Sequence, residues 1–179
     1  MAVSGLGNVQ IGVQKLTFGE EPLGHTDGGC EFSYSPEYTD VMVDAFGSTV
    51  VDKVLTGEAV TVKVPLAEVT LEKLKNAIPT ATLVTDASTP AKKVLTIGST
   101  AGKRLSASAQ TLTLHPTFLL ESDKSYDITL HKAVIVSEIT LPYKVDEKTV
   151  YEVEFMALID DTKEDGNLLA SIGDTSVTK

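Results

Sequence analysis

The sequence predicts a mainly β protein, an antiparallel β-sandwich or barrel of about seven strands with one short flanking helix. Apolar and polar residues alternate over most of the chain, which is the pattern of strands with one buried face. Val, Thr and Leu dominate the composition, and the β-branched residues among them favour strands. No strand–helix–strand alternation is present, so the strands should pair antiparallel. With 179 residues, the chain is predicted to form a single domain over residues 1–179.

The amino-terminal half contains the first group of predicted strands. Val9, Ile11 and Val13 alternate with Gln10 and Gln14, and a bend rich in Pro and Gly follows them. The other segments of this half with strand-like alternation are residues 30–36, 38–44, 50–55 and 59–66.

One segment, residues 70–78, has the period of a helix. Thr70 stands at the capping position and Pro79 ends the run. A short helix with a single apolar stripe is expected to lie on a sheet. The residues of that stripe are Leu71, Leu74 and Ile78.

The second half of the chain again has the pattern of strands. A C-terminal extension, residues 161–179, follows them, and it contains a short apolar patch before a polar end. The predicted strands of this half are residues 94–98, 105–116, 126–139 and 149–160.

Residues 41–55 carry more aliphatic surface than a solvated connection requires. They read as two strand-like runs that meet at a Gly-Ser turn, with Phe46 at the tip. A hairpin that projects alone is marginally stable, and exposed apolar edges favour pairing with another chain. Two interpretations follow: the chain's own core buries this segment, or other copies of the chain do. The apolar residues concerned are Val41, Val43, Phe46, Val50, Val51, Val54 and Leu55.

Residues that could perform chemistry are scattered. His25, His115 and His131 each stand alone, whereas a zinc site requires ligands in close pairs. Cys30 is the only cysteine, so a disulfide within the chain is excluded. No nucleophile stands in the sequence context of a known catalytic motif. The sequence therefore predicts a protein without enzymatic activity, bound metal or cofactor.

The chain is acidic, with 25 Asp and Glu against 15 Lys and Arg and a formal net charge of −10. Affinity for DNA comes mainly from Lys and Arg that neutralise phosphates, so the chain is not expected to hold nucleic acid. A surface past which DNA slides, however, should be negative. Neither a secretory signal nor a run of roughly 20 apolar residues is visible. We therefore expect no membrane partner and synthesis in a cytoplasm.

The order of several segments resembles that of bacteriophage tail tube proteins, the major tail proteins of long-tailed phages. No single segment carries a catalytic signature, and the collinear series is the signal. The matching segments are LGHTDGGCEFSYSP, VDAFGSTVVDKVLTGEAVTVKVPLAEVTLEKLKNAI, LTLHP, YDITLHKAV, TVYEVEFMALID and GNLLASIGD, and they cover most of the chain from Leu23 to Asp174.

This resemblance implies a β-sandwich flanked by a helix, with a long hairpin arm between early strands. It also implies hexameric rings of one chain that stack into a hollow tube, through which the viral genome is ejected without specific binding. Residues 41–55 would be the arm that reaches a neighbouring subunit or ring, and Leu71, Leu74 and Ile78 would seat the helix on the sheet. The amino-terminal residues and residues 161–179 would add contacts between rings or lie on the outside of the tube.

The resemblance further implies a location in the tail of the virion, after synthesis in the host cytoplasm. The expected partners are other copies of the chain and the tape measure, tail-tip and terminator proteins. Acidic side chains that face the lumen would repel DNA phosphates, and the candidates are Glu31, Asp40 and Asp127.

Two alternatives remain open at this stage. The chain could form the inner tube of a contractile tail or a related injection machine. From a different class, it could be a monomeric ligand-binding β-sandwich module, although an aromatic fraction of 6% without Trp disfavours the stacking of sugars.

Overall fold

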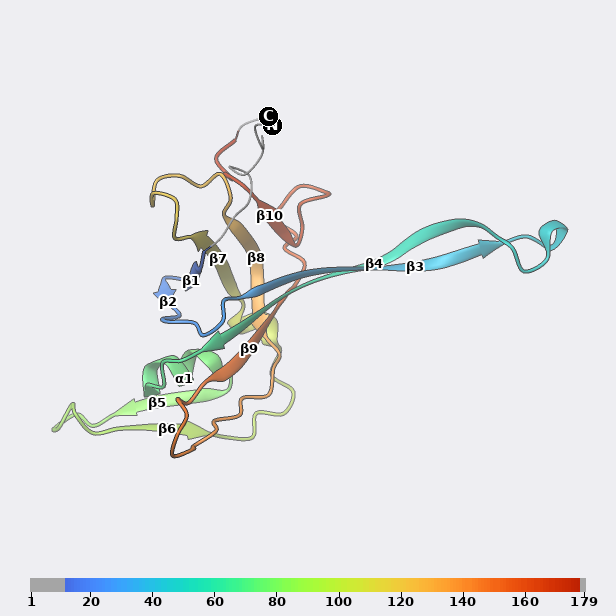
Figure 1. The fold of residues 1–179 in the computed structure, drawn as a ribbon. Helices are drawn as coiled ribbons and strands as arrows, with labels where there is room; N and C mark the ends of the chain where they lie inside the picture. Colours follow the sequence, from blue (N-terminus) through green and yellow to red (C-terminus); the bar gives the residue numbers. More distant parts are fainter. Residues whose placement is uncertain (1–11, 178–179) are drawn as a thin grey trace.

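The computed structural model describes residues 12–177 and consists mainly of antiparallel strands. The main sheet has the order β2-β1-β7-β8-β9-β4-β3, and a further strand, β10, also pairs with β8. The bounds of these strands are β1 Gln14–Phe18, β2 Glu21–Pro22, β3 Glu31–Met42, β4 Val50–Leu66, β7 Gln110–Pro116, β8 Ile128–Ile135, β9 Tyr151–Ala157 and β10 Ala170–Ile172. The predicted fold class, with its one short helix and its long hairpin, is confirmed (Figure 1).

The main sheet curves around a single hydrophobic core. Phe18 on β1 and Phe155 on β9 are separated in the sheet by β7 and β8, yet their ring centroids lie 5.2 Å apart. The two strands can meet only because the sheet bends so that its inner face encloses the core. Alternate residues of each strand point inward, as the period of two requires. The fully buried members of the core include Leu16, Val62, Val64, Leu66, Leu112, Leu114, Leu130, Tyr151, Val153 and Phe155.

The predicted helix is present as α1, Leu71–Ala77. The Thr70 hydroxyl accepts a hydrogen bond from the Lys73 N–H at 3.2 Å, which satisfies one of the free donors of the first turn. Leu74 and Ala77 are buried, whereas Leu71 is 37% exposed. The prediction that Leu71 packs beneath the helix is therefore wrong. Leu71 is the first helical residue, and the small Ala77 occupies the buried stripe in its place.

A smaller sheet lies beside this helix and was only partly predicted. It pairs β5, Ala81–Thr85, with β6, Lys93–Ile97, and both strands contact α1. We expected the second strand but not the first, although Thr82, Val84 and Thr85 are β-branched. In Figure 1 this small hairpin extends from the part of the molecule that holds α1.

Several predicted strands are shorter in the structure. The predicted strand at residues 105–116 begins with a 3-10 turn, η3 Leu105–Ser108, and only Gln110–Pro116 forms β7. Three of its four residues, Ser106, Ala107 and Ser108, are small, and the turn has no apolar alternation. Likewise, β8 ends at Ile135 and β9 at Ala157. Residues 9–11 of the first predicted strand lie outside the described residues, and β2 and β10 were not predicted.

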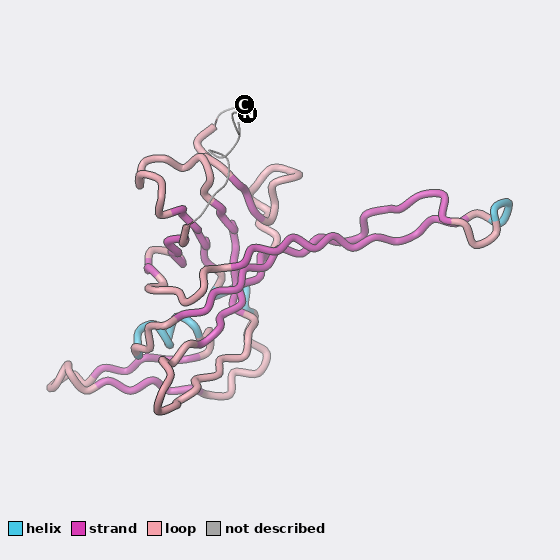
Figure 2. The backbone as a smooth tube through the Cα atoms, in the orientation of Figure 1, coloured by secondary structure: helices cyan, strands magenta, loops and turns pink. Residues whose placement is uncertain are grey.

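Strands β3 and β4 form one long hairpin that leaves the body of the protein (Figures 1 and 2). Its ladder runs from the pair Glu31–Lys63 to the pair Met42–Val50, so the four strands predicted between residues 30 and 66 are two continuous ones. Along β4, buried residues begin only at Val60. We refer to residues 35–59, none of which is buried, as the arm. The arm is therefore longer than the predicted residues 41–55.

Candidate assembly surface

The arm exposes its apolar side chains on both of its faces. Phe46 at the tip is 63% exposed, and Tyr38 and Met42 are each more than half exposed. The interpretation that the chain's own core buries residues 41–55 is therefore wrong for the single chain. Tyr38 and Met42 were not predicted as part of this surface, although they lie in the alternation of the same strand. The predicted arm residues, all exposed by more than a third, are Val41, Val43, Phe46, Val50, Val51, Val54 and Leu55.

The tip of the arm is a defined turn. Residues Asp44–Phe46 form a 3-10 turn, η2, which is closed by hydrogen bonds from the Phe46 N–H to the Val43 carbonyl and from the Gly47 N–H to the Asp44 carbonyl. Gly47 has a φ of 61°, a backbone conformation that glycine adopts without steric cost. This turn, drawn in cyan in Figure 2, lies at the far end of the hairpin, away from the body, and Phe46 is its last residue.

Polar contacts along the arm are few and exposed. Lys53 Nζ lies 2.8 Å from Asp40 Oδ1 across the ladder, and the Thr56 hydroxyl donates to the Glu37 carbonyl at 3.2 Å. Exposed ion pairs of this kind contribute roughly 0–1 kcal/mol. The ladder of backbone hydrogen bonds therefore provides most of the stability of the arm. The described part of the body does not cover the apolar side chains of the arm.

An apolar groove lies at the root of the arm, and we call it the root groove. Its volume is about 510 Å³. Two parts of the chain that are far apart in sequence form it. Phe32, Tyr34 and Val60 come from the base of the β3–β4 hairpin, and Leu168, Leu169 and Ile172 come from the C-terminal segment.

The C-terminal wall of the root groove is attached to the sheet. β10 pairs with β8, the Asp160 N–H donates to the Leu168 carbonyl at 2.9 Å, and the His131 N–H donates to the Leu169 carbonyl at 3.1 Å. Residues 168–172, noted in the sequence only as an apolar patch, are thus part of the main fold. β10 has three residues, too few for its alternation to be recognised in the sequence.

The root groove contains one polar pair on its hairpin wall. The Tyr34 hydroxyl donates a hydrogen bond of 2.6 Å to Glu58 Oε1. This hydrogen bond to a carboxylate raises the pKa of Tyr34. The Tyr34 hydroxyl is therefore satisfied, whereas the second carboxylate oxygen of Glu58 has to keep contact with water when an apolar occupant fills the groove.

The three acids predicted to face a lumen lie in different surroundings. Glu31 is exposed at the base of β3 and stands opposite Lys63 in the ladder. Asp40 lies on the arm and pairs with Lys53. Asp127 is only 7% exposed, so its prediction as a surface acid is wrong. The reason is the β7–β8 register, which sequence alternation does not reveal.

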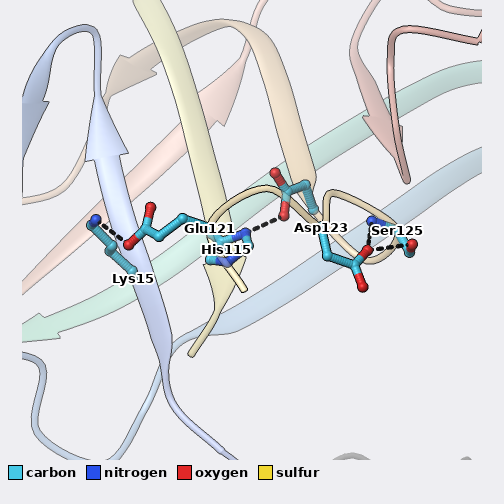
Figure 3. A network of polar contacts seen from close by, with 6 residues as sticks. Lys15, His115, Glu121, Asp123 and Ser125 are labelled. Atoms are coloured by element: carbon cyan, nitrogen blue, oxygen red, sulfur yellow. Dashed lines mark hydrogen bonds and ion pairs between the residues drawn. The ribbon is translucent and has the colours of Figure 1, made fainter. Parts of the chain in front are cut away.

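Asp127 forms a buried pair with His115. The distance from His115 Nδ1 to Asp127 Oδ1 is 2.6 Å, and among the described residues no partner lies within hydrogen-bond distance of His115 Nε2. A network of polar contacts surrounds the pair (Figure 3), including the ion pair of 2.7 Å between Lys15 and Glu121. His115 Nε2 is enclosed and His115 Nδ1 faces Asp127, so the pair lies inside the fold.

The other candidate residues do not converge. His25 lies 3.6 Å from Glu68, and His131 Nε2 lies 3.0 Å from Asn167 Oδ1. Within residues 12–177, no group of three or more His, Cys, Asp or Glu side chains is placed to hold a metal ion. Cys30 is half-buried, and this burial raises the pKa of its thiol.

Two further findings bear on identity. Across the described range, none of the helices combines the length and the apolar character that crossing a membrane requires. Comparison of the chain with models of known protein families and with curated proteins gives no match.

Proposed function

We propose that this chain is a structural tail tube protein of a bacteriophage, whose copies assemble through the arm into stacked hexameric rings. The observation that carries this proposal is the arm itself, a hairpin with apolar side chains exposed on both faces. An isolated hairpin gains little from such side chains, because water surrounds them. A protein that retains them on an ordered projection has a use for them in contact with another chain.

The area of this surface is close to that of one side of a stable interface. The exposed fractions of the apolar residues between Tyr38 and Leu55 correspond to an area on the order of 700 Å². A stable interface buries about 800 Å² on each partner. At about 25 cal/mol per Å², this area provides on the order of 15 kcal/mol, against roughly 4–15 kcal/mol for lost translational and rotational freedom. A single arm contact is thus near balance, and repetition in a tube would add to it.

The free edge of the main sheet also supports assembly. β3 is the last strand of the sheet, and on the described chain no strand pairs with its outer edge over its 12 residues. Exposed edges of this length invite pairing with another chain. A contact between unlike surfaces of identical copies repeats into a closed ring or an open filament, and a tube of stacked rings requires both.

The net charge suits a conduit for DNA. In a hexameric ring, six copies at −10 carry 6 × (−10) = −60. Acidic side chains that face the lumen would repel phosphates over roughly 8–10 Å at physiological salt. Glu31 and Asp40 remain candidates for this role, whereas the buried Asp127 does not. In this proposal, DNA passes through the tube without specific binding, and tape measure, tail-tip and terminator proteins set the length and ends of the tube.

The experiment that tests the proposal compares the assembly of three proteins by sedimentation velocity and negative-stain electron microscopy. The wild type should form rings or tubes as its concentration rises. Phe46→Asp should remain a folded monomer, because it places a charge where apolar burial is required. Val145→Asp is the matched control, since Val145 is fully exposed in a loop away from the arm and should assemble like the wild type. A wild type that stays monomeric at millimolar concentration would contradict the proposal.

One observation favours a second candidate function. The root groove has the volume of a small-molecule site, and such sites span about 300–1,000 Å³. In this alternative, the chain is a monomeric ligand-binding module and the arm has no partner of its own kind. The concentration series above distinguishes the two. The inner tube protein of a contractile machine should also assemble as its concentration rises, so the concentration series does not separate it from a non-contractile tail tube. The presence of a sheath protein in the same particle would identify it.

A further inference from the structure

The geometry points to the root groove as the receptor for the tip of the arm of a second copy of this chain. The inference rests on the proposed function, in which copies meet through the arm, and it identifies the surface that the arm occupies. Two apolar surfaces remain uncovered on the described chain at the arm, one at its tip and one where its root meets the C-terminal segment. One is the tip around Phe46, and the other is the root groove around Ile172.

The tip of an arm cannot fill the groove of its own chain. Between Tyr34 in the groove wall and Phe46 at the tip, the hairpin extends for roughly 40 Å at about 3.3 Å per residue. The ladder is continuous from Glu37 to Met42 apart from two bulges, so the hairpin does not fold back. Figures 1 and 2 show the tip at the end of the molecule that is farthest from the root. An arm tip that fills the groove must therefore come from another copy.

The length of the arm suits a neighbour of the same size. A domain of roughly 150 residues has a radius of gyration of about 15 Å. An arm of roughly 40 Å can therefore extend across the body of an adjacent copy and place its tip at the root of that copy's arm. The length of the arm and the size of the body are therefore compatible with a contact between two copies of this chain.

The chemistry of the two surfaces is complementary. The tip presents Phe46 with Val43 and Met42 beside it, none of which carries a charge, while Asp44 in the same turn is exposed to solvent. The groove presents aliphatic side chains from its C-terminal wall and the rings of Phe32 and Tyr34 from its hairpin wall. Its polar pair, Tyr34 and Glu58, is already joined by a hydrogen bond. An aromatic side chain that fills an apolar pocket is the usual centre of a strong protein interface.

Each copy then offers one tip and one groove, which sets the form of the assembly. The tip of one copy occupies the groove of the next, whose own tip remains available. Such a contact is heterologous and does not end at a two-fold dimer. A variant without a functional tip and a variant without a functional groove should therefore form one contact with each other, between the intact tip of one and the intact groove of the other. No further tip and groove then remain to extend the assembly.

A mixing experiment tests this directly. Phe46→Asp removes the tip, and Ile172→Asp removes the groove; Ile172 is 66% exposed on β10, so the aspartate can be solvated in the folded monomer. Each variant alone should sediment as a monomer. An equimolar mixture should form a heterodimer of one copy of each and nothing larger, as measured by sedimentation velocity and native mass spectrometry. Circular dichroism and thermal unfolding of each variant establish that both are folded.

A milder variant keeps the test decisive if the aspartate disturbs β10. Ile172→Ala retains the strand and should raise the concentration at which assembly begins by on the order of tenfold. Val145→Asp again serves as the control and should assemble like the wild type. The fluorescent probe 8-anilinonaphthalene-1-sulfonate should bind the groove of the monomer and be displaced when the protein assembles.

The outcomes separate this inference from the proposed function. If the wild type assembles but Ile172→Asp and Ile172→Ala assemble equally well, the root groove is not the receptor, and the tail tube proposal stands. A mixture of the two aspartate variants that stays monomeric overturns the inference in the same way. Retention of the probe in assembled tubes shows that the groove is open to a small ligand and also overturns it. A wild type that never assembles overturns both.

Discussion

His115 and Asp127 face each other across the β7–β8 ladder, with His115 Nδ1 2.6 Å from Asp127 Oδ1 and both side chains buried. The pairs Leu112–Leu130, Thr113–Thr129 and Leu114–Ile128 precede them in the same register. The pair therefore continues this register at the end of the ladder, where residues 117–127 join the two strands. A buried pair of this kind costs more to break than it contributes, because the remaining partner is left without its counterpart.

We predict that Asp127→Ala lowers the free energy of unfolding by about 1–3 kcal/mol, since it leaves a buried polar group of His115 without its partner. Replacement of both residues by leucine should recover most of this loss, because no buried polar group is then left unpaired. Urea denaturation of the monomeric Phe46→Asp background measures both effects. Asp123→Ala, in the same loop but only partly buried, is the control and should change the free energy by less than about 1 kcal/mol, because its side chain accepts hydrogen bonds only from the neighbouring Ser125. Equal losses for Asp127→Ala and Asp123→Ala would show that the pair has no special role.

We also predict that acid destabilises the monomer through a set of surface carboxylates. Lys15 lowers the pKa of Glu121 by a hydrogen bond, and the Ser125 side chain does the same to the pKa of Asp123. A carboxyl group whose pKa is lower in the folded state binds its proton more readily when unfolded. The contribution of such a carboxyl group to the free energy of unfolding is fully present above its unfolded pKa of about 4. This contribution is lost as the pH falls through the lower pKa of the folded state. The other carboxylates with a lowered pKa are Glu72, Asp160 and Asp174.

Urea denaturation between pH 7 and pH 2 measures this dependence. The free energy of unfolding should be nearly constant from pH 7 to about pH 5 and should fall below about pH 4. Below about pH 4, the free energy of unfolding of Asp123→Asn should fall less steeply with pH than that of the parent, because one of the responsible carboxyl groups is absent. An Asp123→Asn curve parallel to the parent curve at every pH would contradict the assignment for this residue.

A third prediction concerns the arm in the isolated subunit. Because none of its residues is buried, its amides should open locally and exchange with solvent faster than those of residues 60–66 in the same strand, where alternate side chains are buried. Hydrogen exchange followed by mass spectrometry should show this contrast in the Phe46→Asp monomer. In assembled wild type, the arm should become protected while residues 60–66 change little. An arm that remains unprotected after assembly would show that it takes no part in the contact.

The sequence was most informative where one face of an element is buried. The alternation of Val60, Val62 and Val64 identified the inner half of β4, because burial of one face imposes a period of two. The helix was visible for the same reason, through its cap at Thr70 and its buried Leu74. Leu71 was misassigned because a helix of seven residues has only about two turns, and its first residue can lie beyond the surface on which the helix packs.

Features that depend on contacts between distant segments were not visible. The root groove requires β10 to lie beside β8 and the hairpin base, and three residues are too few to show a period. The burial of Asp127 follows from the register of β7 against β8, which the pairing of whole strands sets. For the same reason, local alternation could not exclude a lumen-facing role for this residue.

Residues 41–55 show which properties the amino-acid sequence determines and which the tertiary structure decides. The amino-acid order alone established an aliphatic hairpin in an acidic, mainly β chain, because backbone periodicity and side-chain polarity are local properties. Whether that hairpin lies inside the molecule or projects from it depends on where the rest of the sheet closes around its core. The core is complete at Val60 and Phe32, so the chain beyond them has no apolar surface of its own left to meet.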